Sequence, residues 1–337
     1  MTQKKILITG ASGFIGSTAV DKALKLGYEV WAGIRASSSR KYLLDERIHF
    51  IDLNYSDKQK LTAQLREFTA QNGRLNAIVH IAGITKAVKK SDFDGVNYLH
   101  VKNLADALIE TDSIPTTFVF MSTLGAVGSG DEKNYTPLPC DAEPNPNTAY
   151  GKSKLKAENY IKSIDGFPYV ILRPTGVYGP RDKDYLILMR AVKSGLNVGA
   201  GFRKQILTFI FVEDLVNIIF DCIDKAIYRK EYNVTDGDIY TDAEFNSIVQ
   251  QILQKKRVMR LKVPLWLVKP AAFLSEKIFG IMSKPTTFNS DKYKIMKQRN
   301  WSCDITPLRT DLDFSPRFPL KKGVEKTVKW YKENGWL

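Results

Sequence analysis

Residues 9–16 read Thr9-Gly10-Ala11-Ser12-Gly13-Phe14-Ile15-Gly16 and join a strand-like apolar segment, 6–9, to a segment with helical spacing, 15–26. Gly10 permits a tight turn, Gly13 lets the backbone approach a pyrophosphate, and Gly16 allows a helix to pack closely on a strand. The N-terminus of such a helix offers free N–H groups and a positive dipole end to phosphates. The sequence therefore predicts a dinucleotide site here, in preference to a purely structural glycine turn.

Strand-like and helix-like segments alternate from this turn through the first 180 residues. Helical spacing occurs at 15–26, 61–68 and 101–109, and short apolar runs occur at 6–9, 30–34, 48–51, 77–81, 118–121 and 170–172. Continuous apolar strands between amphipathic helices are typical of a parallel sheet that is covered on both faces. The pattern predicts an α/β fold with a doubly wound parallel sheet of the Rossmann type.

Beyond residue 174 the regular alternation ends. Helical patterns follow at 186–193, 215–225, 243–253 and 324–333, with loops and prolines between them. At 337 residues the chain has room for two domains. We expect a dinucleotide-binding domain of residues 1–178, to which 207–235 returns, and a smaller, mostly helical substrate-binding region of 179–206 and 236–337.

The net charge of +14 is concentrated near the C-terminus, where residues 255–299 hold twelve Lys or Arg and two acidic residues. This excess attracts an anionic substrate or a lipid surface, or forms a solvated basic face. Nucleic-acid-binding motifs are missing, so no nucleic-acid partner is expected. Residues 263–281 look amphipathic, but Pro264 and Pro270 should break a long membrane-surface helix. We therefore expect this segment to cover a substrate cleft, while a peripheral membrane contact stays open.

Several classes of protein are disfavoured by what the chain lacks. Three cysteines (Cys140, Cys222, Cys303) and three histidines (His49, His80, His100) lie far apart, without metal-ligand spacing. The first residues lack the apolar core of a signal peptide, and no run approaches the roughly 20 apolar residues of a membrane span. We expect a cytoplasmic protein without a metal centre.

The end of the second strand bears on which nicotinamide dinucleotide is used. An acidic residue there would bind the ribose 2′-hydroxyl, whereas an Arg would accept a 2′-phosphate. The strand at 30–34 is followed by Arg35, a run of serines and Arg40, and no acidic residue occurs before Asp45. Arg suits a phosphate through its planar fork of donors. The sequence favours NADP, with NAD as the alternative and a solvated basic loop as the non-functional reading.

The pattern Tyr-x-x-x-Lys occurs three times, at Tyr98, Tyr150 and Tyr293. Only Tyr150 begins a helix after a Pro-rich turn and follows a strand, 118–121, that ends in Ser122-Thr123. In a doubly wound sheet, that places hydroxyl groups at a carboxyl strand end, where ligands bind. The i,i+4 spacing puts Lys154 on the same helix face as Tyr150. We therefore expect the active site at Tyr150 and the other two pairs at the surface.

Together these motifs identify a family. The chain resembles the extended short-chain dehydrogenase/reductases of the NAD-dependent epimerase/dehydratase-like group, over nearly its whole length. The matching stretches include the glycine turn, residues 52–53, 80–83, 96–97, 122–123, 150–154, 172–180, 209–215 and 330–336. The Arg35 loop is similar to the branch of dihydroflavonol reductases and hydroxysteroid dehydrogenases.

The resemblance implies a role for each matching residue. Tyr150 would be the general acid/base, Lys154 would stabilise its anion and hold the nicotinamide ribose, and Thr123 would orient the substrate oxygen, with Ser122 as runner-up. Asn97 would support the helix and sheet behind the site. The implied cofactor-binding residues are Gly10, Ser12, Gly13, Phe14, Ile15, Gly16, Arg35, Arg40, Asp52, Leu53, Ile81, Ala82, Gly83, Ser122, Tyr150, Lys154, Pro174 and Val177.

Two departures from the family pattern bear on the substrate. Sugar-nucleotide epimerases carry an Asn near the end of the sixth strand and an Arg before a later aromatic strand; this chain has Arg173-Pro174-Thr175 and Leu207-Thr208 there. We expect an NADP-dependent oxidoreductase interconverting a secondary alcohol and a ketone on a small organic molecule, and an anionic substrate stays open. A sugar-nucleotide epimerase or dehydratase with tightly bound NAD(P) is the first alternative, and a non-catalytic dinucleotide sensor the second. A homodimer is the oligomer to test.

Overall fold

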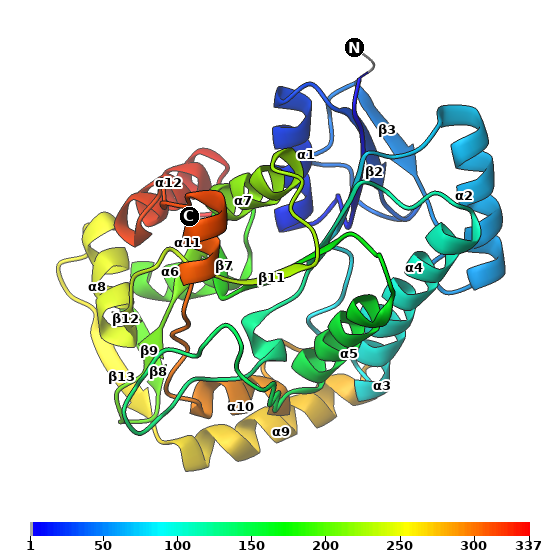
Figure 1. Cartoon of the computed structure of the whole chain (residues 1–337). Helices are drawn as coiled ribbons and strands as arrows, with labels where there is room; N and C mark the ends of the chain where they lie inside the picture. The colour runs from blue at the N-terminus through cyan, green and yellow to red at the C-terminus, as the bar shows by residue number, and fades with distance from the viewer. Residues whose placement is uncertain (1–2) are drawn as a thin grey trace.

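A parallel sheet of seven strands forms the centre of the computed structural model, which describes residues 3–337 (Figure 1). The strand order is β11-β6-β5-β4-β1-β2-β3. The strands are β1 (Lys5–Thr9), β2 (Glu29–Gly33), β3 (Ile48–Ile51), β4 (Ala77–His80), β5 (Thr117–Met121), β6 (Tyr169–Pro174) and β11 (Lys230–Val234). The order reverses between β1 and β4, which puts the ligand crevice at their carboxyl ends. The predicted doubly wound α/β fold is confirmed.

Helices cover both faces of this sheet. On one face lie α1 (Phe14–Lys25), α7 (Val212–Asp224) and α11 (Thr306–Leu312); on the other lie α2 (Lys58–Asn72), α4 (His100–Glu110) and α5 (Ala149–Ser163). Within β1, Ile6 and Ile8 pack into the first layer and Leu7 into the second. Side chains alternate between two buried faces, which explains why most positions of these strands are apolar.

The C-terminal region adds helices and short sheets beside the carboxyl ends of the central strands. The helices α6 (Asp184–Lys193), α8 (Asp242–Ile252) and α12 (Leu320–Glu333) share a separate apolar cluster. Three two-stranded sheets pair β7 (Gly176–Tyr178) with β10 (Phe209–Phe211), β9 (Ile206–Leu207) with β12 (Tyr240–Thr241), and β8 (Leu196–Ala200) with β13 (Met259–Val263). The division of the chain into two domains stays a prediction.

The expectation that Pro264 and Pro270 break a long helix within residues 263–281 is wrong. They form a continuous helix, α9 (Leu265–Ile281), which packs on α10 (Ser290–Lys297) and lies along the lower edge of the molecule in Figure 1. Pro264 precedes the helix, and Pro270 is its sixth residue, so it removes only one backbone hydrogen bond, to the Trp266 carbonyl. Across residues 3–337, none of the helices combines the length and the apolarity that a membrane crossing requires.

Candidate functional site

The turn between β1 and α1 forms a cradle in which positions 10 and 16 leave no room for a side chain. Gly10 has a φ of +65°, and a Cβ atom on it would lie 2.9 Å from the backbone nitrogen of Ala82. A Cβ on Gly16 would collide with the Gly10 carbonyl, so α1 packs directly on the turn. Gly13 precedes α1 and leaves its first turn without a side-chain cap. These free N–H groups fit the diphosphate of a dinucleotide.

A hydroxyl group fastens the end of β4 to this cradle. The Thr9 Oγ1 accepts hydrogen bonds from the backbone N–H groups of Ile81 (3.1 Å) and Ala82 (3.0 Å). It also lies 3.2 Å from Nδ1 of the buried His80. Burial lowers the pKa of His80 to about 3. The uncharged imidazole fits this buried contact, and the segment 81–83 is held against the glycine turn.

Two adjoining chambers open at the carboxyl ends of the strands. The first, of about 470 Å³, borders the glycine turn and is lined among others by Phe14, Ile15, Ile81, Gly83, Met121, Ser122, Lys154 and Val177. The second, of about 360 Å³, has an apolar wall that includes Val198, Leu207, Phe209, Phe245, Ile295, Met296 and Trp301. Seven residues line both chambers: Thr123, Tyr150, Pro174, Thr175, Tyr185, Leu188 and Lys292.

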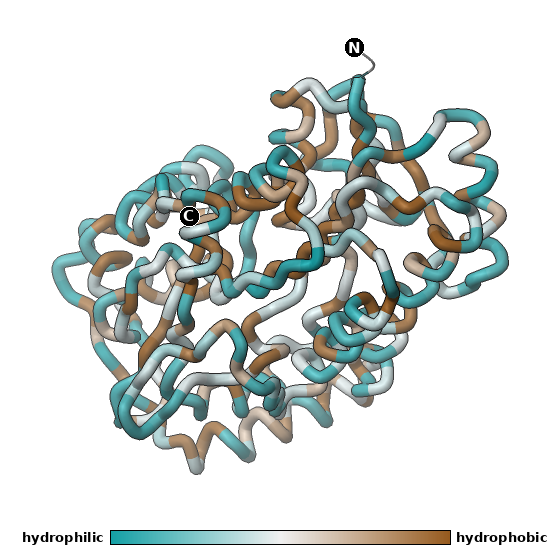
Figure 2. The backbone as a smooth tube through the Cα atoms, in the orientation of Figure 1, coloured by the Kyte–Doolittle hydropathy of each residue, from teal (hydrophilic) through white to brown (hydrophobic). Residues whose placement is uncertain are grey.

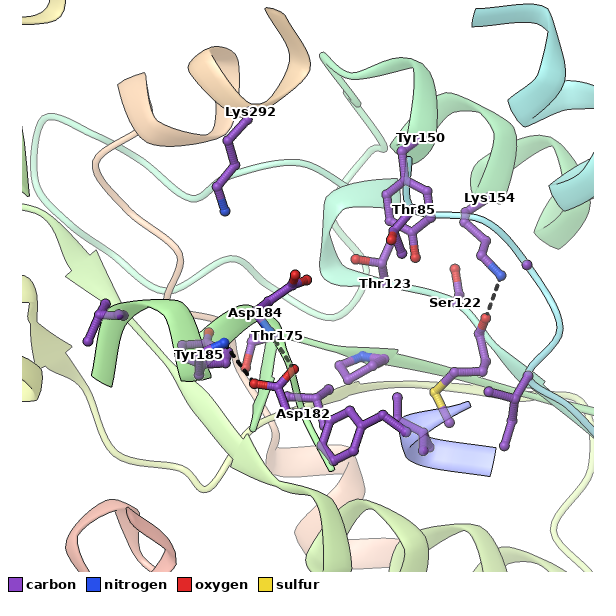
Figure 3. Close-up of a pocket in the computed structure, with 18 residues that line it drawn as sticks. Thr85, Ser122, Thr123, Tyr150, Lys154, Thr175, Asp182, Asp184, Tyr185 and Lys292 are labelled. Atoms are coloured by element: carbon purple, nitrogen blue, oxygen red, sulfur yellow. Dashed lines mark hydrogen bonds between the residues drawn. The ribbon is translucent and has the colours of Figure 1, made fainter. Parts of the chain in front are cut away.

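The side chains expected to act meet at the junction of the chambers. Tyr150 lies in the first turn of α5, which Thr148 caps by accepting the Gly151 N–H at 3.0 Å. Lys154 follows one turn later and is 3% exposed; its ammonium donates to the Met121 carbonyl at 2.8 Å. Thr123 caps the short helix Leu124–Ala126. Figure 3 shows Tyr150, Thr123 and Lys154 near one another on one side of the first chamber.

Burial works against the charged forms of both Tyr150 and Lys154. It raises the pKa of the Tyr150 phenol to about 12 and lowers the pKa of the Lys154 ammonium to about 8. The nearby Glu158 carboxylate partly opposes the second shift. A positive charge at Lys154 favours the phenolate of Tyr150. The pair can thus hold or release a proton at the Tyr150 oxygen.

The lowered pKa of Lys154 predicts how stability depends on pH. Between pH 8 and 10.5 the unfolded chain keeps this proton and the folded chain loses it, so the wild-type protein gains stability as pH rises. Lys154→Met removes the buried charge and should stabilise the protein at pH 7 by up to about 3 kcal/mol. The difference in unfolding free energy between Lys154→Met and the wild type should disappear near pH 10, and urea unfolding measures it. The exposed Lys152→Met is the control, and a Lys154→Met difference that is independent of pH contradicts the assignment.

Asn97 holds the first turn of α5 from behind. It is fully buried in a π-helical segment, Asp94–Leu99, between α3 (Lys90–Phe93) and α4. Its amide accepts the Ile84 N–H at 2.8 Å and donates to the Ser153 hydroxyl at 3.1 Å. Ser153 in turn donates to the Tyr150 carbonyl at 2.7 Å. Asn97 therefore connects the loop after β4 to the turn that carries Tyr150, and π-helical turns often occur at functional sites.

A buried ion pair lies one turn beyond Lys154. Arg173, at the end of β6, donates from Nη2 to Glu158 at 2.6 Å and to Glu231 at 2.5 Å. Arg173 is 3% exposed and Glu158 is fully buried. The Ser122 hydroxyl also donates to Glu158. Ser122 is thus occupied by a structural partner, whereas the Thr123 side chain lines both chambers.

The remaining predicted cofactor residues lie on the loops beside the turn. Arg35 is exposed directly after β2, and the Arg40 guanidinium lies 4.1 Å from the centre of the Phe50 ring. The Asp52 carboxylate accepts the Ala36 N–H at 2.8 Å and so supports this loop. Leu53 is buried, and Ser12 is half-buried within the glycine turn. Pro174 and Val177 line the first chamber.

The far wall contains residues that sequence reasoning did not single out for the site. Asp184 and Tyr185 begin α6, Thr175 follows β6, and Lys292 lies on α10. Figure 3 shows Lys292 and Asp184 across the first chamber from Tyr150. Of the twelve basic residues in 255–299, only Lys292 lines either chamber. No local motif surrounds these positions, so only their packing reveals them.

Within residues 3–337, no cluster of three or more His, Cys, Asp or Glu side chains is placed to hold a metal ion. The site consists of the glycine cradle, the two chambers and the hydroxyl, phenol and ammonium groups beside them.

Comparisons with known proteins show which family and fold this chain resembles. Residues 6–235 match the NAD dependent epimerase/dehydratase family. A UDP-glucose 4-epimerase of Vibrio cholerae is 29% identical, over 96% of this chain and 94% of that protein. A ceramide reductase of Caulobacter vibrioides is 22% identical, over 98% of this chain and 96% of that protein. The structure of a UDP-glucuronic acid 4-epimerase from Bacillus cereus, in complex with NAD, has a TM-score of 0.74 at 21% identity and covers 98% of this chain and 99% of that one.

The match covers more than half of the chain and includes the glycine cradle, Tyr150 and Lys154. The resemblance seen in the sequence is thus confirmed at the level of the family. The chain belongs to the NAD-dependent epimerase/dehydratase family, within the extended short-chain dehydrogenases/reductases.

Proposed function

We propose that the protein interconverts a secondary alcohol and a ketone on an apolar organic molecule, with a nicotinamide dinucleotide as redox partner. The observation that carries this proposal is the position of Tyr150 and Thr123 at the junction of the two chambers. The first chamber borders the glycine cradle and suits the cofactor, and the second suits the substrate. A reacting carbon at the junction would be within reach of both.

The chain's own groups supply the proton chemistry. A bound nicotinamide dinucleotide donates or accepts the hydride. The Tyr150 hydroxyl gives a proton to the substrate oxygen during reduction, and the Tyr150 phenolate takes that proton back during oxidation. The Lys154 ammonium stabilises the phenolate, which a pKa near 12 otherwise disfavours. The Thr123 hydroxyl donates to the same oxygen and fixes its direction.

The charges of the second chamber support a neutral substrate. Its lining has one acidic and one basic residue, Asp242 and Lys292, and the first chamber adds Asp182 and Asp184 against Lys154. No Arg lines either chamber among the described residues. A nucleoside diphosphate would thus face few cations, whereas apolar walls favour an apolar molecule. The likeness to a ceramide reductase points the same way.

Sugar-nucleotide epimerisation is the second candidate, and the comparisons as a whole favour it over net alcohol–ketone chemistry. The family match and the likeness to UDP-glucose 4-epimerase support it. The structure shows what occupies the two positions where epimerases carry Asn and Arg. Arg173 is buried against Glu158, and Thr208 donates to the Trp301 carbonyl at 2.6 Å. The Arg173 guanidinium and the Thr208 proton are thus engaged within the protein, although Thr208 lines the second chamber.

One assay separates the two candidates. The protein is mixed with NADH or NADPH and, separately, long-chain ketones and UDP-hexoses, and the reduced cofactor is followed by its absorbance. Net oxidation of the cofactor with a ketone supports the proposal. Conversion of a UDP-hexose to its epimer, seen by NMR without net change of cofactor, overturns it in favour of the second candidate.

The cofactor preference is proposed to be NADP, because Arg35 is exposed at the position that meets the 2′-substituent of the adenosine ribose. Arg35→Asp should lower the affinity for NADPH by roughly 10–100-fold, the range expected for lost charged hydrogen bonds. The affinity for NADH should stay level or rise. Titration calorimetry measures both, and Arg66→Asp, exposed on α2, is the control. A wild-type protein that prefers NADH contradicts this assignment.

A further inference from the structure

The outer side of α9 exposes many large apolar side chains. Ile281 is 87% exposed and Trp266 72%, and only Val268 and Ala272 of the helix are buried. Figure 2 shows apolar positions along this helix at the lower edge of the molecule. We use the name "α9 face" for six exposed residues of this helix: Trp266, Leu267, Phe273, Leu274, Ile278 and Ile281. Contiguous exposed apolar side chains mark an interaction surface.

The spacing of these residues places them on one side of the helix. Trp266 and Phe273 are seven residues apart, and Leu267 is followed by Leu274, Ile278 and Ile281 at intervals of seven, four and three. Residues at such intervals lie on the same face of a helix, and this face is opposite the one that holds Val268 and Ala272. The helix thus packs on the protein through a few small contacts and directs its bulkiest residues outward.

Basic residues are frequent within α9 and in the sequence on either side of it. Residues 255–284 contain eight Lys or Arg and a single acidic residue, Glu276. The Glu276 carboxylate accepts the Ser290 N–H at 3.0 Å, at the start of α10, and so is already engaged. The Lys277 ammonium lies 5.5 Å from the centre of the Phe273 ring. Lys side chains beside apolar groups can extend their ammonium groups into a layer of anionic headgroups.

We propose that the α9 face docks on an anionic lipid surface, with the helix lying in the plane of the membrane interface. Large apolar residues on one face, Trp266 among them, and lysines beside them match helices that lie at such interfaces. A second copy of the chain would set basic residues against basic residues, whereas acidic headgroups complement them. The helix need not cross the membrane for this contact.

The docking surface is continuous with a wall of the second chamber. The helix α10, on which α9 packs, contributes Lys292, Ile295 and Met296 to the chamber, and β8, the partner of β13, contributes Val198 and Ala200. The lipid surface would thus lie against elements that enclose the apolar chamber. The docking itself does not depend on which reaction the site performs.

Sedimentation with vesicles tests this proposal on the full chain. The protein should bind vesicles of phosphatidylcholine mixed with phosphatidylglycerol and leave vesicles of phosphatidylcholine alone in solution. Binding should weaken as salt screens the charges. Each neutralised lysine, in Lys269→Ser and Lys277→Ser, should lower the partition constant about fivefold. Neutralising Lys321 and Lys332 on α12 in the same way is the control.

Substitution of the apolar residues gives the second arm. Trp266→Glu and Phe273→Glu should abolish binding to the anionic vesicles, whereas Leu44→Glu, at a side chain 80% exposed near β2, should leave it intact. Thermal melts verify that each variant is folded. Equal binding to both kinds of vesicle, or no binding together with a dimer in sedimentation equilibrium that Trp266→Glu dissociates, would overturn the proposal.

Discussion

Tyr150→Phe is expected to lower turnover by roughly 10²–10⁴-fold, because it removes the proposed proton donor and leaves the ring in place. The Phe ring keeps the edge contact with Phe93, whose centre lies 6.2 Å away, so the shape of the junction is retained. Cofactor affinity should change little, since the glycine cradle and Lys154 are untouched. Steady-state kinetics and calorimetry on the same preparation measure the two quantities.

A second tyrosine provides the control for this substitution. Tyr185 also lines both chambers and is the other phenol at the junction. Tyr185→Phe should leave turnover within a few-fold of wild type. If instead Tyr185→Phe is inactive and Tyr150→Phe is active, the proton donor is Tyr185 and the assignment to Tyr150 is wrong.

Arg173→Met is expected to lower the free energy of unfolding by about 3–5 kcal/mol, the usual cost of breaking a buried ion pair from one side. The variant leaves the fully buried Glu158 carboxylate with only the Ser122 hydroxyl as a close donor. Urea unfolding followed by circular dichroism measures the loss. Since Glu158 lies one turn after Lys154 on α5, turnover should fall as well.

Two further variants separate charge from packing in this cluster. Lys162→Met removes the partially exposed cation that lies 3.2 Å from Glu231 and should cost at most about 1 kcal/mol. Adding Glu158→Gln to Arg173→Met removes the uncompensated charge and should recover part of the lost stability. A double variant as unstable as the single one would show that packing around Arg173, and not its charge, stabilises the fold.

The parts of the fold that the sequence predicted depend on short-range constraints. The glycine turn is recognisable because Gly10 adopts a positive φ and Gly16 packs against the Gly10 carbonyl, both within a few residues. Tyr150 and Lys154 are one helical turn apart, so their spacing alone puts them on one face. The central strands are recognisable because both of their faces are buried.

What the sequence did not reveal depends on contacts between distant segments. Arg173 reads as a departure from a family motif, and its partner Glu231 is 58 residues away. Lys292 lines both chambers because α10, which packs on α9, lies beside them. Pro270 suggested a broken helix, but the helix continues through it with one backbone hydrogen bond missing.

The fastening of β4 to the glycine cradle through Thr9 has a consequence for the lifetime of the chain. Thr9 and His80 are 71 residues apart, so the cradle does not exist until β1 and β4 have paired. A dinucleotide therefore binds the folded ensemble alone, and at a hundred times its dissociation constant it shifts the unfolding equilibrium by about 2.7 kcal/mol. Cofactor abundance would then govern turnover of the polypeptide itself, since a starved cell exposes more unfolded chain to its proteases.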